Sequence, residues 1–130
     1  MSTYKKFEDL EVWKMSRELC YALHLACQKK EVPNSGYLIN HLYKTAGSIM
    51  DNIAEGFERG GNKELLQFLY IAKGSSGEFR SQVYRALDLD VFSQDQFDGL
   101  IKKSVLISQQ LGLFINYLKK SSYKGDKFKP

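Results

Sequence analysis

The sequence predicts an all-α protein, an antiparallel up-down-up-down four-helix bundle, and three observations lead to that prediction. Four long segments repeat apolar residues at intervals of three and four, the spacing that places side chains on one face of an α-helix. Short links separate these segments, so consecutive helices must run antiparallel. No window alternates apolar and polar residues for long, as a β-strand would. A chain of 130 residues suffices for one domain, which we expect to span residues 1–120.

The first two helices are predicted over residues 9–29 and 35–57. The first ends near Pro33, because proline disfavours helical backbone at the residue before it. The second is followed by the helix-breaking pair Gly60 and Gly61. Each helix has one stripe that we expect to be buried: Val12, Ser16, Leu19, Leu23 and Ala26 in the first, and Leu38, Leu42, Thr45, Ile49 and Ile53 in the second.

The third helix is predicted over residues 63–89, with Asn62 as its N-cap. The fourth begins at a capping box formed by Ser93 and Gln96. From Ser121 the composition turns polar and basic, so residues 121–130 are expected to form a flexible tail. The expected buried stripes are Leu65, Leu69, Ala72, Ser76, Phe79, Val83 and Ala86 in the third helix, and Phe97, Leu100, Ser104, Ile107, Leu111, Phe114 and Leu118 in the fourth.

Two glycines, Gly74 and Gly77, lie in the middle of the third helix, where each costs about 1 kcal/mol relative to alanine. A helix tolerates this cost where another backbone approaches closely. The sequence leaves two interpretations open, tight packing inside the bundle and contact between subunits.

The composition is that of a cytoplasmic protein without a membrane segment. The net charge is +4, with the basic excess at the two ends of the chain, which favours anionic partners. No apolar run is long enough to span a bilayer, and the N-terminus is not a signal peptide. Cys20 and Cys27 lie about 10 Å apart on one helix, too far for a disulfide, so we expect reduced, buried thiols.

The sequence predicts neither an enzyme nor a cofactor or metal site. Neither His24 nor His41 has a glutamate three residues before it, as di-iron bundles require, and two cysteines alone cannot complete a zinc site. Asp51 and Glu55 lie one helical turn apart and could serve acid-base chemistry. The alternative is structural: Glu55 pairs with a basic residue of a neighbouring helix, and Asn52 forms hydrogen bonds inside the bundle.

Three segments together resemble the 23S rRNA intervening-sequence protein family: residues 7–13 (FEDLEVW), residues 52–57 (NIAEGF), which include Asn52, Glu55 and Gly56, and residues 62–78 (NKELLQFLYIAKGSSGE). The resemblance covers about residues 7–120. Met50 and Asp51 stand where the family commonly has Pro-Ser, so the second helix should be straighter than in other members.

The resemblance implies a bundle that assembles into a ring-shaped homopentamer and carries no catalytic residues. A related branch of similar fold acts as the accessory protein of diversity-generating retroelements and partners a reverse transcriptase. The resemblance therefore implies oligomerisation, and a nucleic acid or a protein as partner.

A nucleic-acid-binding surface is predicted on the third helix, where Tyr70, Lys73, Gly77, Arg80 and Tyr84 form a stripe offset from the apolar one. Cations attract phosphates, and aromatic rings stack on unpaired bases, which favours RNA. The basic end of the chain adds a second cationic site at Lys119, Lys120 and Lys124.

Each of these surfaces has an alternative interpretation. Tyr70 and Tyr84 could pack in a subunit interface while Lys73 and Arg80 are solvated, and the tail could only aid solubility. The chain would then be a scaffold that docks another protein. Its aromatic residues, eight Tyr, eight Phe and one Trp, exceed what four inward stripes absorb. This excess favours a homo-oligomer.

Overall fold

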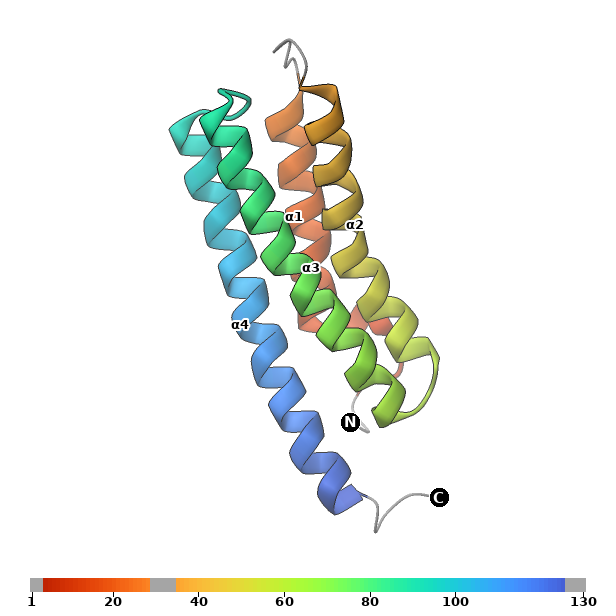
Figure 1. The fold of residues 1–130 in the computed structure, drawn as a ribbon. Coiled ribbons are helices and arrows are strands. Elements are labelled where there is room, and N and C mark those ends of the chain that lie inside the picture. Colours follow the sequence, from red (N-terminus) through yellow and green to blue (C-terminus); the bar gives the residue numbers. More distant parts are fainter. Residues whose placement is uncertain (1–3, 29–34, 126–130) are drawn as a thin grey trace.

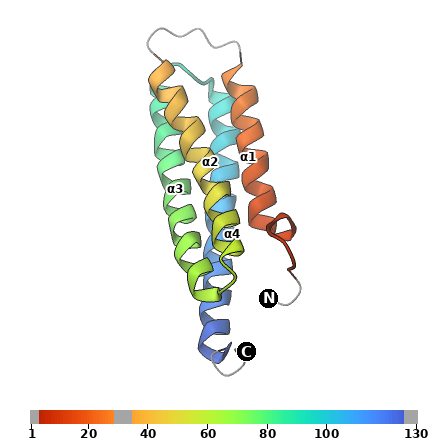
Figure 2. The same ribbon diagram turned by 90° about the vertical axis from the view of Figure 1, so that its right-hand side faces the viewer.

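The structure, a computed structural model, describes residues 4–28 and 35–125, with the backbone only for residues 122–125. A 3-10 turn, η1 (Phe7–Asp9), precedes four helices: α1 (Glu11–Cys27), α2 (Gly36–Glu58), α3 (Asn62–Asp88) and α4 (Gln94–Gly125). The helices run alternately up and down, each packs against the next, and α1 also packs against α4 (Figures 1 and 2). The described residues contain no strand. The predicted all-α four-helix bundle is confirmed.

The core consists of the predicted stripes. Every stripe residue predicted for α1, α2 and α3 is buried. In α4 one position is wrong, since Ile115 is buried while Phe114 is only partly buried. The ring of Phe114 instead lies 6.4 Å from that of Tyr4. Three residues outside the helices, which periodicity could not identify, complete the core at the bundle's ends: Leu10, Val91 and Phe92.

The predicted capping box opens α4. The backbone N–H of Ser93 donates to the Gln96 side chain at 3.0 Å, and the Gln96 N–H donates to the Ser93 hydroxyl at 3.2 Å. At α3 the prediction is off by one residue: Gly61 is the N-cap, and Asn62 is the first helical residue. Backbone geometry decides this difference, because Gly61 is extended and Asn62 is already helical.

The remaining helix ends follow from local backbone chemistry. Gly60 has a φ of +87° after α2, a conformation that glycine adopts without a steric penalty. Asp90 has a φ of 60° after α3. There the Val91 N–H donates to the Ala86 carbonyl and the Asp90 N–H to the Leu87 carbonyl, a Schellman motif. The reversal between α3 and α4 is thus fixed by hydrogen bonds.

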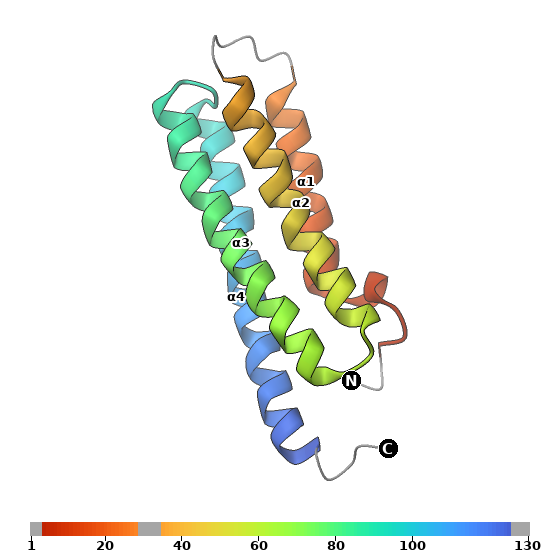
Figure 3. The ribbon, with the colours of Figure 1, turned by 45° about the vertical axis from the view of Figure 1, so that its right-hand side comes forward.

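The lower part of α4 extends past the ends of its neighbours (Figure 3). Its helical backbone continues to Gly125, into the segment for which the sequence predicts a flexible tail. That flexibility stays a prediction, because residues 126–130 lie outside the described residues. None of the helices in the described ranges is both long enough and apolar enough to cross a membrane.

The glycines of α3 do not serve tight packing inside the bundle. A Cβ atom added at Gly74 or Gly77 would meet nothing within 4 Å, so this interpretation is wrong. The small buried residues between them are serines. Ser75 shares a 3.0 Å hydrogen bond with Ser48 of α2. Ser76 donates to the Ser104 carbonyl of α4 at 3.1 Å, and the Ser108 hydroxyl donates to Ser76 at 3.1 Å.

Candidate nucleic-acid interface

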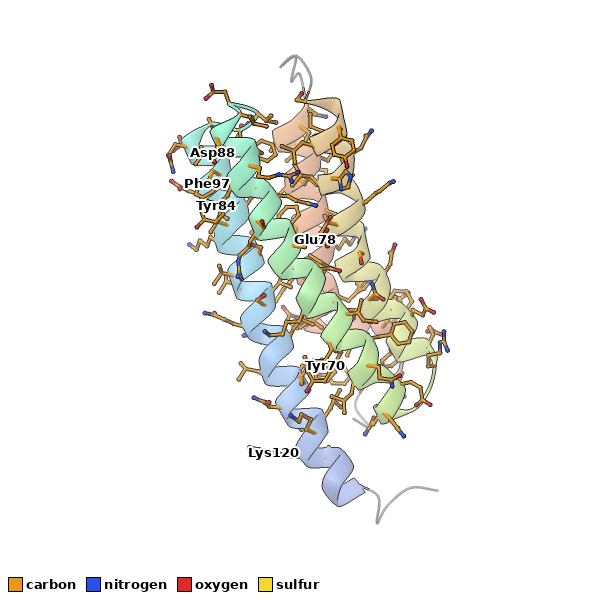
Figure 4. All side chains as sticks on the ribbon, viewed as in Figure 1. Tyr70, Glu78, Tyr84, Asp88, Phe97 and Lys120 are labelled. Carbon is orange, nitrogen blue, oxygen red and sulfur yellow. The ribbon has the colours of Figure 1, made fainter. Side chains whose placement is uncertain are left out.

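The predicted stripe on α3 is largely at the surface. Tyr70 and Tyr84 are 50% and 54% exposed, Lys73 is exposed, and Arg80 is partly buried. The stripe is offset from the buried face because its residues lie on the side of α3 that borders α4. Figure 4 shows Tyr70 toward the lower end of α3 and Tyr84 near its upper end. Fourteen residues of helix separate the two rings by about 20 Å, so they cannot form one compact site.

The lower half of the stripe joins α4 in an open groove of about 430 Å³, here called the α3–α4 groove. It is lined by Tyr70, Lys73 and Gly74 of α3 and by Gly112, Ile115 and Asn116 of α4. A Cβ added at Gly112 would make an ordinary van der Waals contact, at 3.7 Å, with the Lys73 Cε, so the lysine side chain lies close to this turn of α4. None of the described residues that line this groove is a carboxylate.

The cations of lower α4 lie beside this groove. Lys119 and Lys120 are exposed and follow Asn116 by about one helical turn. Figure 4 shows Lys120 below Tyr70 along α4. The pairing of α3 with α4 thus places Lys73 beside Gly112, seven residues before Lys119 on α4, although Lys73 is far from both α4 lysines in the sequence. The side chain of Lys124, the other predicted contact, lies outside the described residues.

The upper half of the stripe has different surroundings. The Tyr84 ring packs edge-on against Phe97 of α4, with 4.9 Å between centroids. Figure 4 shows Asp88 close to this pair. The Asp88 carboxylate would repel phosphate, and the Tyr84 ring is already in contact with Phe97. The upper half of the stripe is therefore less suited than the lower half to binding phosphates and bases.

The motif residues Asn52 and Glu55 have structural partners within α2. The Asn52 amide donates to the Ser48 carbonyl at 2.7 Å and to its hydroxyl at 2.9 Å. Glu55 accepts from Arg59 at 2.8 Å, so the prediction that it pairs with a neighbouring helix is wrong. Glu55 and Arg59 are one helical turn apart, so their side chains meet without reaching across to another helix.

Gly56 marks a close approach between α2 and α3. A Cβ at this position would lie 2.5 Å from the Cβ of Phe68 and 3.3 Å from Leu65. The first two turns of α3 therefore fit against α2 because residue 56 has no side chain. This gives the glycine of the NIAEGF motif a packing role.

The histidines and cysteines form no metal site among the described residues. His24 lies 3.3 Å from the Tyr43 hydroxyl, and the His41 ring packs 4.4 Å from that of Tyr37. The Cys20 thiol donates to the Met50 sulfur at 3.7 Å. Burial, and secondarily the Asp51 carboxylate, raises the pKa of Cys20 from 9.0 to about 11. This thiol is protonated and unreactive at neutral pH.

A second groove was missed in the sequence. It lies between α1 and α4, measures about 790 Å³ and is here called the α1–α4 groove; its lining residues are Lys14, Arg17, Glu18, Tyr21, Ala22, Leu25 and Lys103. A signal existed, because Lys14, Arg17, Tyr21 and Leu25 recur at helical spacing on a face offset from the buried stripe. The sequence could not indicate that Lys103 lines the same groove, because that depends on α1 packing against α4.

The fold and the surface together place this protein in the class of helical bundles. Its exposed tyrosines and lysines gather in open grooves between neighbouring helices. The particular family follows from comparison. The chain matches the 23S rRNA-intervening sequence protein family over residues 8–112, and it therefore belongs to this family. This confirms the resemblance drawn from residues 7–13, 52–57 and 62–78. A comparison with curated proteins finds no match.

A solved structure supports the fold. It is a protein of unknown function from the S23 ribosomal protein family of Bacteroides thetaiotaomicron VPI-5482, with a TM-score of 0.69 and 18% sequence identity. The match covers 80% of this chain and 97% of that chain. At this identity the likeness concerns the fold alone. Neither the family match nor this structure indicates an enzymatic activity.

Proposed function

We propose that this chain is a non-enzymatic, homo-oligomeric bundle protein that binds RNA through the α3–α4 groove and the lysines beside it. One observation carries the proposal: the half-exposed ring of Tyr70 lies in a groove with Lys73 and without a carboxylate. An exposed ring beside cations suits single-stranded nucleic acid, because bases stack on the ring while phosphates meet the ammonium groups.

The spacing of the cations supports contact with several phosphates. Lys73 faces Gly112, and Lys119 lies seven residues further down α4, about 10 Å away. Lys120 follows, and Lys124 extends the same basic sequence. A single strand that passes over Tyr70 would meet Lys73 first and the α4 lysines next. Arg80 lies seven residues, about 10 Å, from Lys73 along α3, so a strand that follows the stripe upward would reach Arg80 and then Tyr84.

Oligomerisation is supported by the tyrosines that the monomer leaves exposed. Seven tyrosines of the described residues are exposed, and five of them lie outside both grooves: Tyr4, Tyr37, Tyr43, Tyr84 and Tyr117. Aromatic residues are enriched at subunit contacts. We propose a ring-shaped pentamer, the assembly that the family resemblance implies, in which repeated grooves turn weak phosphate contacts into avidity. Light scattering at micromolar protein concentration should then report five chains.

RNA binding is tested by fluorescence anisotropy with a labelled single strand across a salt series. The wild type should lose affinity steeply as salt rises. The double variant Lys73→Glu with Arg80→Glu should bind at least about tenfold more weakly at low salt. The control, Lys44→Glu with Arg85→Glu, makes the same charge change at exposed positions outside both grooves. Equal binding by the first variant and the wild type would remove the α3 face as the site.

The alternative function is an accessory scaffold that docks another protein, such as a reverse transcriptase. The open surface at Gly74 and Gly77 favours a protein contact on α3, because a Cβ at either position would meet only open space and another backbone has room to approach. The dependence of RNA affinity on salt concentration distinguishes the two functions. Affinity for RNA that is weak at all salt concentrations would favour the scaffold.

A further inference from the structure

The α1–α4 groove combines three cations with exposed apolar side chains. Lys14, Arg17 and Lys103 line it together with a single carboxylate, Glu18. Within residues 4–28 and 35–121, none of these three cations forms an ion pair. The guanidinium of Arg17 lies 5.9 Å above the Trp13 ring, which keeps it on the surface of α1. The groove therefore holds unneutralised positive charge on both of its walls.

The apolar part of the groove is exposed to an unusual degree. Tyr21 is 63% exposed, and Leu25, one turn further along α1, is 48% exposed. On α4, Leu106 follows Lys103 by three residues and is 42% exposed, although it does not line the groove itself. Large apolar side chains that gather on a surface and are rimmed by charges mark sites of protein interaction. From Lys14 to Leu25 the groove runs along about 16 Å of helix.

The chemistry of these residues selects the occupant. Tyr21 offers a ring on which a base could stack, but Leu25 offers none and Glu18 repels phosphate, so this groove suits an apolar helix better than a nucleic acid. A helix that lays leucines or aromatic rings against Tyr21 and Leu25 would bury them. Acidic residues on the flanks of that helix would meet Lys14 and Arg17 on one wall and Lys103 on the other.

We propose that the α1–α4 groove is a docking site for an acidic amphipathic helix of a partner protein, with about three helical turns in contact. Apolar burial supplies the affinity, and the three cations select an acidic segment and fix its register. This site is separate from the α3–α4 groove. One chain can therefore hold RNA on one side of α4 and a protein segment on the other.

The probe for this proposal is a labelled synthetic peptide of about 15 residues, with leucines at positions i, i+3, i+4 and i+7 and glutamates on the flanks. Fluorescence anisotropy should show saturable binding. The variant Tyr21→Ala with Leu25→Ala, and the variant Arg17→Glu with Lys103→Glu, should each weaken binding at least about tenfold. Circular dichroism should show both variants folded, because the altered side chains are exposed. Lys73→Glu with Lys119→Glu is the control and should leave peptide binding unchanged.

Three results would overturn the proposal. A peptide of the same composition in scrambled order could bind equally well, which would reduce the effect to charge alone. Single-stranded RNA could displace the peptide from the groove. The Tyr21→Ala, Leu25→Ala variant could break the oligomer, which would show that a second copy of the chain fills the groove. RNA binding by the α3–α4 groove is measured independently, so the failure of one site leaves the other intact.

Discussion

The two seams of α4, which are its interfaces with α3 and with α1, differ in how closely the helices pack. Along α3, small side chains let the helices approach, and Ser76 forms hydrogen bonds with both Ser104 and Ser108 of α4. Along α1 the packing is less extensive. Long side chains such as Arg17 and Tyr21 line that seam and leave an open groove of about 790 Å³.

This difference separates stability from recognition. The inner α3 seam favours one register of the bundle, because in that register Ser76 bonds to both the Ser104 carbonyl and the Ser108 hydroxyl. The α1–α4 seam tolerates a groove, because the bundle is already held by α2, α3 and α4. Changes on the inner face of α3 should therefore affect unfolding, whereas changes in either groove should affect binding.

Leu69 is fully buried in α3, between α2 and α4. Leu69→Ala should lower the free energy of unfolding by about 2–5 kcal/mol, because it removes apolar contacts and leaves a cavity. Ile71→Ala, two residues away and half exposed, is the matched control and should change stability by less than about 0.5 kcal/mol. Urea unfolding measures both. Similar losses for the two variants would contradict the assignment of the buried face.

Gly56 and Gly74 form a second matched pair. Gly56→Ala should destabilise by about 1–3 kcal/mol, because the new methyl group overlaps the Phe68 Cβ. Gly74→Ala should instead stabilise the helix by about 1 kcal/mol, since its Cβ meets nothing and alanine favours helix. Thermal unfolding distinguishes the signs. A Gly74→Ala variant that loses oligomeric mass in light scattering would show that Gly74 lies in a subunit contact.

The hydroxyl of Ser76 tests the inner seam directly. Ser76→Ala removes one hydrogen bond to the Ser104 carbonyl and one from Ser108, and leaves both groups without this partner. We expect a loss of about 1–3 kcal/mol in urea unfolding. Ser81→Ala, at an exposed position of the same helix, should be nearly neutral. An equally neutral Ser76→Ala would mean that the serine bonds do not hold α3 against α4.

Cys20 gives the smallest effect, and one that depends on pH. Its pKa in the folded protein is raised to about 11 by burial and then by Asp51, so the folded thiol stays protonated where the unfolded one ionises. Stability from this group is complete below about pH 9 and is lost as pH rises toward about 11. Urea unfolding at pH 8 and pH 10 should show this loss in the wild type and less of it in Cys20→Ala. The same pH dependence in both proteins would exclude Cys20 as its source.

The sequence was sufficient for the fold because each helix has one apolar stripe with an unambiguous period. Where two adjacent residues were both apolar, as at Phe114 and Ile115, periodicity could not decide which one enters the core. Leu10, Val91 and Phe92 are buried by loop geometry, which has no period. These limits are local, and they left the helix order and the buried faces unchanged.

The candidate site could be predicted only in part. The sequence placed Tyr70, Lys73 and Tyr84 on one outward stripe, and all three are exposed. The sequence could not show that Tyr84 packs against Phe97, or that Lys73 and Lys119 lie beside the same groove. These relations depend on how α3 and α4 pair, as the α1–α4 groove depends on the pairing of α1 with α4. Helix pairing across a bundle is set by packing and leaves no motif in the sequence.

The division between the two grooves is tested most directly by RNA binding of two variants with the same change in charge. Lys73→Glu with Lys119→Glu alters the α3–α4 groove, and Lys14→Glu with Lys103→Glu alters the α1–α4 groove. We predict that the first variant binds single-stranded RNA at least about tenfold more weakly, with a salt slope reduced by roughly 1.4, since each lost phosphate contact contributes about 0.7. The second variant should lose less than about threefold, because screening limits the reach of its charges to about 10 Å. Equal losses, or a larger loss for the second variant, would contradict the assignment of RNA to the α3–α4 groove.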